Sequence, residues 1–380
     1  MDQLDRPGRD PWLDNTRLLA AVLIVVMHVC GSAMSRSGAL YELWFATWPL
    51  RVPLFVLVAG FFSSAEPLRG RRAVSLLRNV LGVYLVADLV ASLANWLTDS
   101  SFGYGPANPP FALWFLLSLF WWRALLPLVA HVRYIGVIAS VAAVGAGFVS
   151  QIGPTFSASR TIAYLPLFLL GWNLRRIGLR SLIDRRWVRP AAWVTLAGVF
   201  AVGIVVNDRL GRAAYAMRED YPGGGPVEQL PHAGVRGVLL LYGALGALAM
   251  IAVMPRRRIP VLTYLGTGSM YIYVIHALIV GQWAFRRTDW YRAIDTVGEM
   301  TLLIIAAVVG ALLLATPPVR WATRWLIQPS YTWLFREQVP PTPPLGGQSS
   351  TPSPAASPSA ASVSATPPPT PPPAAPPPSR

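Results

Sequence analysis

Ten apolar stretches of about membrane length organise this sequence. The hydrocarbon core of a bilayer is crossed by about 20 apolar residues in a helix. The stretches run over residues 14–33, 43–63, 76–97, 111–130, 133–150, 161–175, 190–206, 235–254, 261–282 and 300–317. Charged residues make up only 13% of the chain, whereas soluble domains carry about 25%. We therefore predict an all-α integral membrane protein with about ten transmembrane helices.

Arginine is concentrated in alternate loops between these stretches. The loops of one side, with the adjoining ends of the stretches, contain Arg69, Arg71, Arg72, Arg78, Arg123, Arg133, Arg175, Arg176, Arg180, Arg185, Arg186, Arg189, Arg256, Arg257, Arg258, Arg320 and Arg324. Cytoplasmic loops of membrane proteins carry such an excess of basic residues. The pattern predicts a multi-pass protein of the cytoplasmic membrane with both termini in the cytoplasm. It also attributes the net charge of +15 to topology, so no nucleic-acid partner is expected.

The composition divides the chain into four parts. Residues 1–13 form a predicted cytoplasmic N-terminus, and residues 14–320 contain all the apolar stretches. Tryptophan and arginine alternate in 321–339, which is typical of a short interfacial helix. Residues 340–380 consist mainly of Pro, Ala, Ser and Thr. Such a segment cannot bury a core, so we predict a disordered C-terminal tail.

The first apolar stretch carries a polar stripe. Eleven residues turn a helix through about 1100°, nearly three full turns, so Arg17 and His28 share one face about 16 Å apart. Asp14 lies about 40° off the same line. An ionisable group facing lipid costs a few kcal/mol or more. The stripe is therefore expected to face the protein interior or a wet cavity.

Three ionisable side chains in different stretches share one depth. His28, Arg51 and His276 each lie about 10 Å from the same predicted membrane surface, counted at 1.5 Å per residue. Ser269, Tyr273 and His276 follow i, i+4, i+7 spacing, so they form one helical stripe. A shared cavity explains a common depth most simply. Whether the helices are neighbours does not follow from the sequence.

Each of these features also has a purely structural explanation. A histidine within a span can simply form a hydrogen bond between helices. Pro53 favours a kink from which Arg51 could snorkel outward. Asp14 and Arg17 could form an ion pair that anchors the helix end. Trp114 is predicted to be an aromatic residue of the membrane interface.

The inventory of reactive groups favours direct transfer between two bound substrates. The sequence has no Gly-x-Ser-x-Gly elbow, P-loop, HExxH or Cys/His metal spacing, and Cys30 is its single cysteine. We therefore expect no metal and no bound cofactor. A histidine in a water-poor cavity suits a general base, and an arginine can stabilise an oxyanion. Proton relay in a carrier uses similar groups.

The motifs, in order, resemble the membrane acyltransferase-3 family. Arg17, ten intervening residues and His28 are similar to that family's signature in its first span. The stretch 51–62, which begins with Arg51 and ends in glycine and aromatics, is similar to its second span. Weaker matches occur at 113–116, 168–172 and 269–276. The resemblance covers about residues 10–320, the whole predicted membrane region.

The resemblance implies a reaction and a donor. The family's members take an acyl group, usually acetyl, from cytoplasmic acyl-CoA and deliver it to a hydroxyl of an acceptor at the outer membrane face. On this basis His28 is the expected base. Arg51 and His276, which share its predicted depth, complete the candidate catalytic set. Ser269 and Tyr273 are expected to support it.

The resemblance also implies donor-binding residues. Asp14 and Arg17 correspond to the cytoplasmic entry of the donor. The family carries an Arg-x-x-Arg element before its third span, but this sequence has Ser75 after Arg72, and the next arginine is Arg78. We expect Arg72 and Arg78 to bind the CoA phosphates, which is chemistry that arginine suits.

The sequence therefore predicts a membrane O-acyltransferase, with acetyl as the expected acyl group, that modifies an envelope glycan, glycolipid or related acceptor. Acyl-CoA, a saccharide or lipid-linked acceptor and the bilayer are the expected partners. We expect the loop 207–234 to contribute to acceptor binding. The alternative is a proton-coupled transporter or exporter of a glycan or lipid. A third possibility is a structural or sensory module that recruits partners through residues 340–380.

Overall fold

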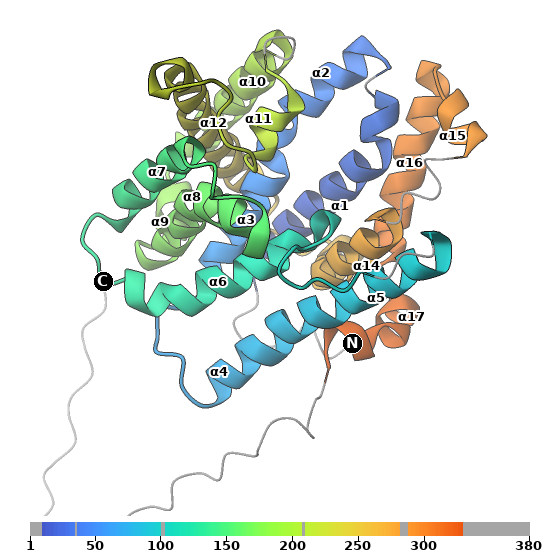
Figure 1. Cartoon of the computed structure of the whole chain (residues 1–380), viewed down its shortest axis with the longest axis horizontal. Coiled ribbons are helices and arrows are strands. Elements are labelled where there is room, and N and C mark those ends of the chain that lie inside the picture. The colour runs from blue at the N-terminus through green and yellow to red at the C-terminus, as the bar shows by residue number, and fades with distance from the viewer. Residues whose placement is uncertain (1–9, 35, 100–102, 207–209, 282–287, 330–380) are drawn as a thin grey trace, which may run out of the picture. The chain divides into compact units, whose positions relative to one another are not determined.

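The computed structural model describes residues 10–34, 36–99, 103–206, 210–281 and 288–329, and every regular element within these ranges is a helix (Figure 1). The longer helices are α1 (Pro11–Met34), α5 (Val83–Asp99), α6 (Trp114–Val129), α7 (Ile135–Gly145), α8 (Ala158–Arg176), α10 (Val188–Val206), α12 (Pro226–Val253), α14 (Ser269–Gly281) and α16 (Val297–Leu313). The shorter ones are α2 (Gly38–Ala46), α3 (Val52–Phe61), α4 (Arg71–Leu76), α9 (Leu179–Ile183), α11 (Arg212–Ala216), α13 (Pro260–Gly266), α15 (Asp289–Ala293), α17 (Pro317–Ala322) and α18 (Arg324–Ile327). Single turns link several of them: η1 (Trp48–Leu50), η2 (Leu77–Gly82), η3 (Phe111–Leu113), η4 (Ala146–Phe148) and η5 (Thr155–Ser157).

Five helical segments are long and apolar enough to cross a membrane. They are Pro11–Met34, Arg71–Leu97, Phe111–Val129, Val188–Val206 and Pro226–Val253. Two further pairs of helices each pass the same test as one bent span. The described residues thus contain five to seven candidate spans, as expected of a multi-pass membrane protein.

The predicted count of ten spans is not confirmed. All ten predicted stretches fall on helices, but some of these helices are short. Ile135–Phe148 and Val297–Leu313 are apolar yet shorter than the roughly 20 residues that a bilayer core requires. The predicted interfacial segment 321–339 overlaps the end of α17 and all of α18. Residues 330–339 of this segment, most of the N-terminal segment and the predicted disordered tail at 340–380 lie outside the described residues.

The predicted second span is broken in its middle. α2 and the segment formed by η1 and α3 meet at an angle of 54° around Thr47–Arg51. Pro49 and Pro53 lie at the start of the two segments after the break. Proline has no backbone N–H, so neither residue can donate to a preceding carbonyl as a helix requires. The break brings Arg51, whose own backbone is non-helical, into the interior.

A second break separates α13 from α14, with a bend of 63°. Gly266 ends α13 where it meets α1. A Cβ atom at Gly266 would lie 2.2 Å from the carbonyl oxygen of Asp14, so only glycine allows this approach. The break directs α14 along α1, which also packs against α13, α16 and α3 (Figure 1).

Two glycines hold α3 and α8 in direct backbone contact. A Cβ at Gly60 would lie 1.9 Å from the carbonyl oxygen of Phe168, and a Cβ at Gly171 would lie 1.9 Å from that of Leu57. Small residues permit such close helix crossings in membrane proteins. The contact fixes the position of α8 relative to Arg51, the residue that precedes α3.

The outer helices expose large apolar side chains. Val141 of α7, Val194 of α10 and Leu302 of α16 are 68%, 74% and 67% exposed. An apolar surface of this kind is unfavourable in water and suits contact with lipid tails.

We predict that Gly171→Leu disrupts the α3–α8 contact. The added side chain has no space, and overpacking costs about 1–3 kcal/mol or more of folding free energy. Gly198→Leu is the matched control, because Gly198 also lies within a helix and a Cβ there meets nothing within 4 Å. The measurement is the apparent melting temperature of the purified protein. Equal melting temperatures for the two variants would contradict the prediction.

Candidate active site

The imidazoles of His28 and His276 are hydrogen-bonded to each other in the protein interior. Nδ1 of His28 lies 3.0 Å from Nε2 of His276, and the ring centroids are 5.3 Å apart. α1 supplies one ring and α14 the other, so the bond joins two helices that are distant in sequence. The two histidines for which the sequence predicts a common depth are therefore direct neighbours.

The second hydrogen bond of His276 determines which nitrogen atoms carry protons. Its Nδ1 lies 3.0 Å from the carbonyl oxygen of Ile272. A carbonyl only accepts, so this nitrogen carries the proton, and Nε2 of the neutral ring accepts from His28 Nδ1–H. Neutral His28 then has its lone pair on Nε2, as a general base requires.

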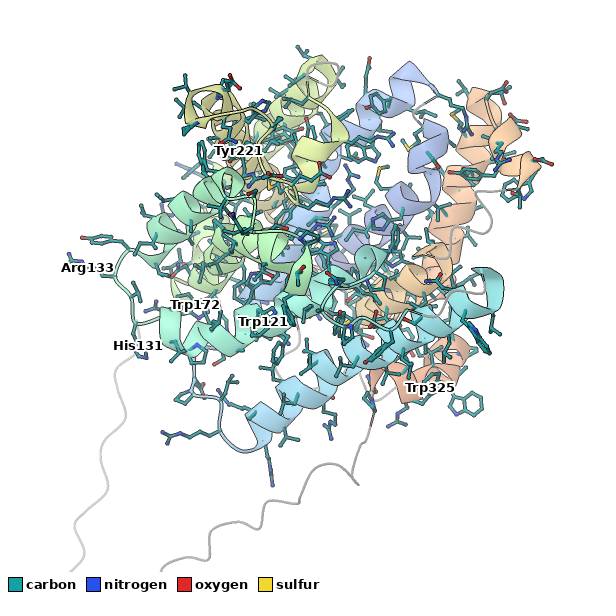
Figure 2. All side chains as sticks on the ribbon, in the orientation of Figure 1. Trp121, His131, Arg133, Trp172, Tyr221 and Trp325 are labelled. Carbon is teal, nitrogen blue, oxygen red and sulfur yellow. The ribbon has the colours of Figure 1, made fainter. Side chains whose placement is uncertain are left out.

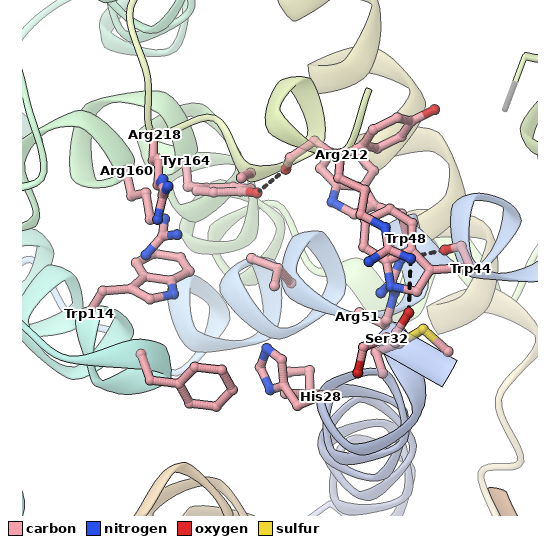
Figure 3. A pocket seen from close by; sticks show the side chains of 17 residues that line it. His28, Ser32, Trp44, Trp48, Arg51, Trp114, Arg160, Tyr164, Arg212 and Arg218 are labelled. Carbon is pink, nitrogen blue, oxygen red and sulfur yellow. Dashed lines mark hydrogen bonds between the residues drawn. The ribbon is translucent and has the colours of Figure 1, made fainter. Parts of the chain in front are cut away.

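His28 lines a cavity of about 520 Å³, which we call the His28 cavity. Its walls come from α1, the break before α3, the start of α6, α8 and α11 (Figure 3). The volume lies in the range of small-molecule sites, about 300–1,000 Å³. Arg51, the second candidate catalytic residue, lines the same cavity, so the structure brings all three members of the predicted catalytic set together.

Arg51 is positioned by the break in the second span. Its side chain donates from Nη2 to the carbonyl of Trp44 at 2.5 Å and from Nε to that of Thr47 at 3.3 Å. The guanidinium also lies 4.5 Å from the ring centroid of Trp44. Arg51 is only 5% exposed, so it does not snorkel outward. The polar atoms freed by the break thus hold a cation inside the span.

Trp114 is a buried wall of the cavity, not the interface residue that its sequence context predicts. It is 9% exposed, and the guanidinium of Arg160 lies 4.8 Å from its ring centroid. Tyr164, one turn after Arg160 in α8, stacks on the same indole at 5.6 Å. Sequence reasoning missed Arg160, although its position at the start of a predicted span was a usable signal.

The loop 207–234, expected to contribute to acceptor binding, closes the cavity with α11 and the residues after it. Arg212, Tyr215 and Arg218 line the wall (Figure 3). Arg212 donates to the carbonyl of Gly31 at 2.8 Å. Burial raises the pKa of Tyr215 to about 12, so its hydroxyl remains protonated at neutral pH.

His276 also borders a separate apolar cavity of about 380 Å³. Val25 and Val29 of α1 and Leu303 and Ala307 of α16 line it. The histidine pair therefore separates an arginine-rich cavity from an apolar one. The low polarity on the His276 side favours the neutral, hydrogen-bonded form of the pair.

Arginines also gather in a second, larger cavity of about 810 Å³, which we call the basic cavity. Its arginines are Arg72, Arg78, Arg123, Arg320 and Arg324. Arg72 and Arg78 are the two residues expected from the sequence to bind the donor phosphates, whereas the other three are attributed there only to topology. All five lie in or next to loops that are predicted to share one side of the membrane. That common side was the sequence signal that could have grouped them.

Two hydroxyl groups and one carboxylate contact guanidinium groups of the basic cavity. Arg320 donates to Oγ1 of Thr267 at 3.0 Å, and Arg123 donates to Oγ of Ser63 at 3.2 Å. Arg72 forms an ion pair with Glu66. One carboxylate among five arginines leaves a strongly basic cavity.

Asp14 and Arg17 form an ion pair of 3.2 Å near the basic cavity. Asp14 is 1% exposed and is not among the residues that line the basic cavity. Arg17 lies 4.0 Å from the ring centroid of Phe62, a lining residue of the basic cavity. Since Arg17 and His28 are eleven residues apart on α1, the helix leads from one cavity to the other over about 16 Å.

Of the two expected supporting residues, Tyr273 lies beside the histidine pair, and neither Tyr273 nor Ser269 lines the His28 cavity or the basic cavity. The hydroxyl of Tyr273 donates to the carbonyl of Ala112. Its ring meets that of His276 at a centroid distance of 5.5 Å, so it packs against the partner of His28. Ser269 is buried at the start of α14.

The fold and the two cavities define a multi-pass membrane protein with a histidine site at one end of α1 and a basic site at the other. Residues 10–316 match the profile of the acyltransferase domain family. The chain belongs to this family, the membrane acyltransferase-3 family, and is an acyltransferase. Family membership favours this activity over the transporter alternative.

No curated protein and no solved structure matches the chain.

We predict that Arg51→Gln destabilises the break between α2 and α3. The shorter, neutral side chain leaves buried carbonyls without their donor, at a cost of about 1–3 kcal/mol. Arg133→Gln is the control, because Arg133 is exposed in the turn between α6 and α7 (Figure 2). Thermal unfolding of the two variants measures the difference. An unchanged melting temperature for Arg51→Gln would show that the carbonyls do not depend on it.

Proposed function

We propose that the protein transfers an acyl group from acyl-CoA to a hydroxyl of an acceptor held in the His28 cavity. The observation that supports this best is the hydrogen-bond chain from Ile272 through His276 to His28. The chain leaves the lone pair of His28 on Nε2 in a residue that lines a substrate-sized cavity. A hydrogen bond that merely tied two helices together would not require such a cavity.

The proposed step needs no covalent enzyme intermediate. The acceptor hydroxyl attacks the thioester carbonyl while His28 Nε2 takes its proton. The carbon–sulfur bond breaks, and the proton passes to the leaving thiolate to give free CoA. Arg51 stabilises the negative charge on the carbonyl oxygen in the transition state. His276 keeps the proton of His28 on Nδ1 and fixes the orientation of the ring.

The basic cavity is the proposed donor site. CoA carries a 3′-phosphate and a pyrophosphate, and guanidinium groups bind phosphate through charge-assisted, bidentate hydrogen bonds. Arg72 and Arg78 are joined there by Arg123, Arg320 and Arg324. Arg17 lies where the extended chain of acyl-CoA that carries the thioester would leave the basic cavity towards His28.

The positive-inside rule orients the reaction. The loops that carry the basic cavity are rich in arginine, so this side and both termini are assigned to the cytoplasm of a cytoplasmic membrane. The His28 cavity then opens towards the outer side. Acetyl is the proposed acyl group, and an envelope glycan or glycolipid is the proposed acceptor. These assignments follow the family resemblance and the charge pattern.

We predict that His28→Ala lowers turnover by about 100- to 10,000-fold, the usual contribution of a general base. His276→Ala is expected to lower it by up to about 100-fold, because the base remains but loses its orientation. Release of free CoA from acetyl-CoA by purified protein is the measurement. His131→Ala is the control, because His131 lies in an exposed turn (Figure 2). Normal turnover in His28→Ala would rule out its role as base.

We predict that Arg78→Gln raises KM for acetyl-CoA about tenfold or more, the effect of one lost hydrogen bond to a charged group. The value of kcat should stay nearly unchanged, because the phosphates lie far from the reacting atoms. Arg256→Gln is the control, since Arg256 pairs with Asp184 outside the basic cavity. Steady-state kinetics with varied acetyl-CoA provide the test. A fall in kcat at constant KM would place Arg78 elsewhere in the mechanism.

A further inference from the structure

Four guanidinium groups surround the His28 cavity, and none of the residues that line it is acidic. They belong to Arg51, Arg160, Arg212 and Arg218. Arg160 and Arg218 lie on one side of His28, and Arg51 and Arg212 lie on the other (Figure 3). The histidine is therefore flanked by cations from three separate parts of the chain.

Only one of the four arginines has a carboxylate partner among the described residues. Arg218 pairs with Glu219 at 2.9 Å. Arg51 and Arg212 donate to backbone carbonyls. Arg160 lies over the ring of Trp114. Carbonyl dipoles and ring faces orient a cation but do not neutralise its charge.

Uncompensated cations close together in a site of low dielectric are unfavourable. Each buried charge loses hydration, and like charges in one cavity repel one another. Arg51, with 5% exposure, lacks access to bulk water that would reduce this cost. A bound anion would relieve the desolvation and the repulsion together.

The hydrogen-bonding groups of the cavity point to the same ligand chemistry. Guanidinium groups only donate, so they match the oxygens of phosphate and carboxylate, which only accept. Neutral sugar hydroxyls donate as well as accept, and a site for them would be expected to offer carboxylates or side-chain amides. The residues that line the His28 cavity include neither.

We propose that the acceptor is anionic, and that Arg160 and Arg212 hold its phosphate or carboxylate group while a hydroxyl meets His28. The identification as acceptor rests on the proposed function, whereas the binding of an anion does not. The basic cavity separately serves the phosphates of the donor. Both substrates of the reaction would thus be bound through negative charge at opposite ends of α1.

The test is equilibrium binding of small sugars to the full chain in nanodiscs of neutral phosphatidylcholine, without acyl donor. Trp44, Trp48 and Trp114 line the cavity, so tryptophan fluorescence reports its occupancy. The probes are glucose, glucose 1-phosphate and glucuronate. We expect at least one anionic probe to bind about tenfold or more tightly than glucose, and its affinity should fall as salt is added. A response to glucose 1-phosphate alone indicates a phosphate group, and a response to glucuronate alone indicates a carboxylate.

Arginine variants locate the binding site. Arg160→Gln and Arg212→Gln should weaken the anionic probe about 10- to 100-fold, the range for one lost charge-assisted hydrogen bond. Arg160→Lys keeps the charge and should restore part of the affinity. Arg36→Gln is the control, because Arg36 lies at the same end of α1 but donates to the carbonyls of Tyr291 and Ile294 outside the cavity.

The outcomes separate this proposal from the proposed function. Equal affinity for glucose and both anionic probes would overturn the anionic acceptor, and so would equal losses in Arg160→Gln and Arg36→Gln. A third contrary result would be loss of 3′,5′-ADP binding in Arg160→Gln, because it would assign the donor to the His28 cavity.

Anion binding should persist in His28→Ala. Turnover that depends on His28 without anion binding would contradict only the acceptor assignment, and anion binding without turnover would contradict only the acyl transfer.

Discussion

The hydrogen bond between His28 and His276 is the interaction on which the proposed chemistry depends. An ionisable group inside a span is costly unless it has a partner, and here each imidazole satisfies the other. The backbone carbonyl of Ile272 makes the pair directional, because it fixes the proton of the second ring. A bond that any two buried histidines could form therefore also prepares one of them to accept a proton.

Breaks in two helices make this arrangement possible. The bend after Gly266 directs α14 along α1, and the bend around Thr47–Arg51 turns a guanidinium towards the same region. Non-helical backbone at membrane depth is tolerated only where protein or a cavity satisfies its polar groups. Arg51 meets that requirement with its own side chain, so its structural and chemical roles cannot be separated by a single substitution.

The sequence predicts the helices well, because they follow from counting residues along apolar stretches. It places Arg17 and His28 on one face of α1 by the same arithmetic. Pro53 indicates a kink in the stretch 43–63, but the break at Thr47–Arg51 was not predicted, since the stretch is largely apolar around Arg51. Arg160 and Arg212 were missed as cavity residues because the cavity forms only when segments of α1, α8 and α11 line one space, and the sequence does not show that arrangement. The number of helices that cross the membrane also depends on how the helices pack, so composition alone does not determine it.

Eleven residues of α1 separate the two cavities, and that distance has a further consequence. Leu18, Ala21 and Val25 lie within this interval and belong to a buried apolar cluster with Ile272. An inorganic ion would have to shed its water to cross such a layer, which is costly. Methylene and thioester groups lose little by the same passage. In the proposed reaction the acyl group would therefore pass between the two cavities through a layer that blocks inorganic ions, so that acyl transfer would leave the electrochemical gradient of the cell intact.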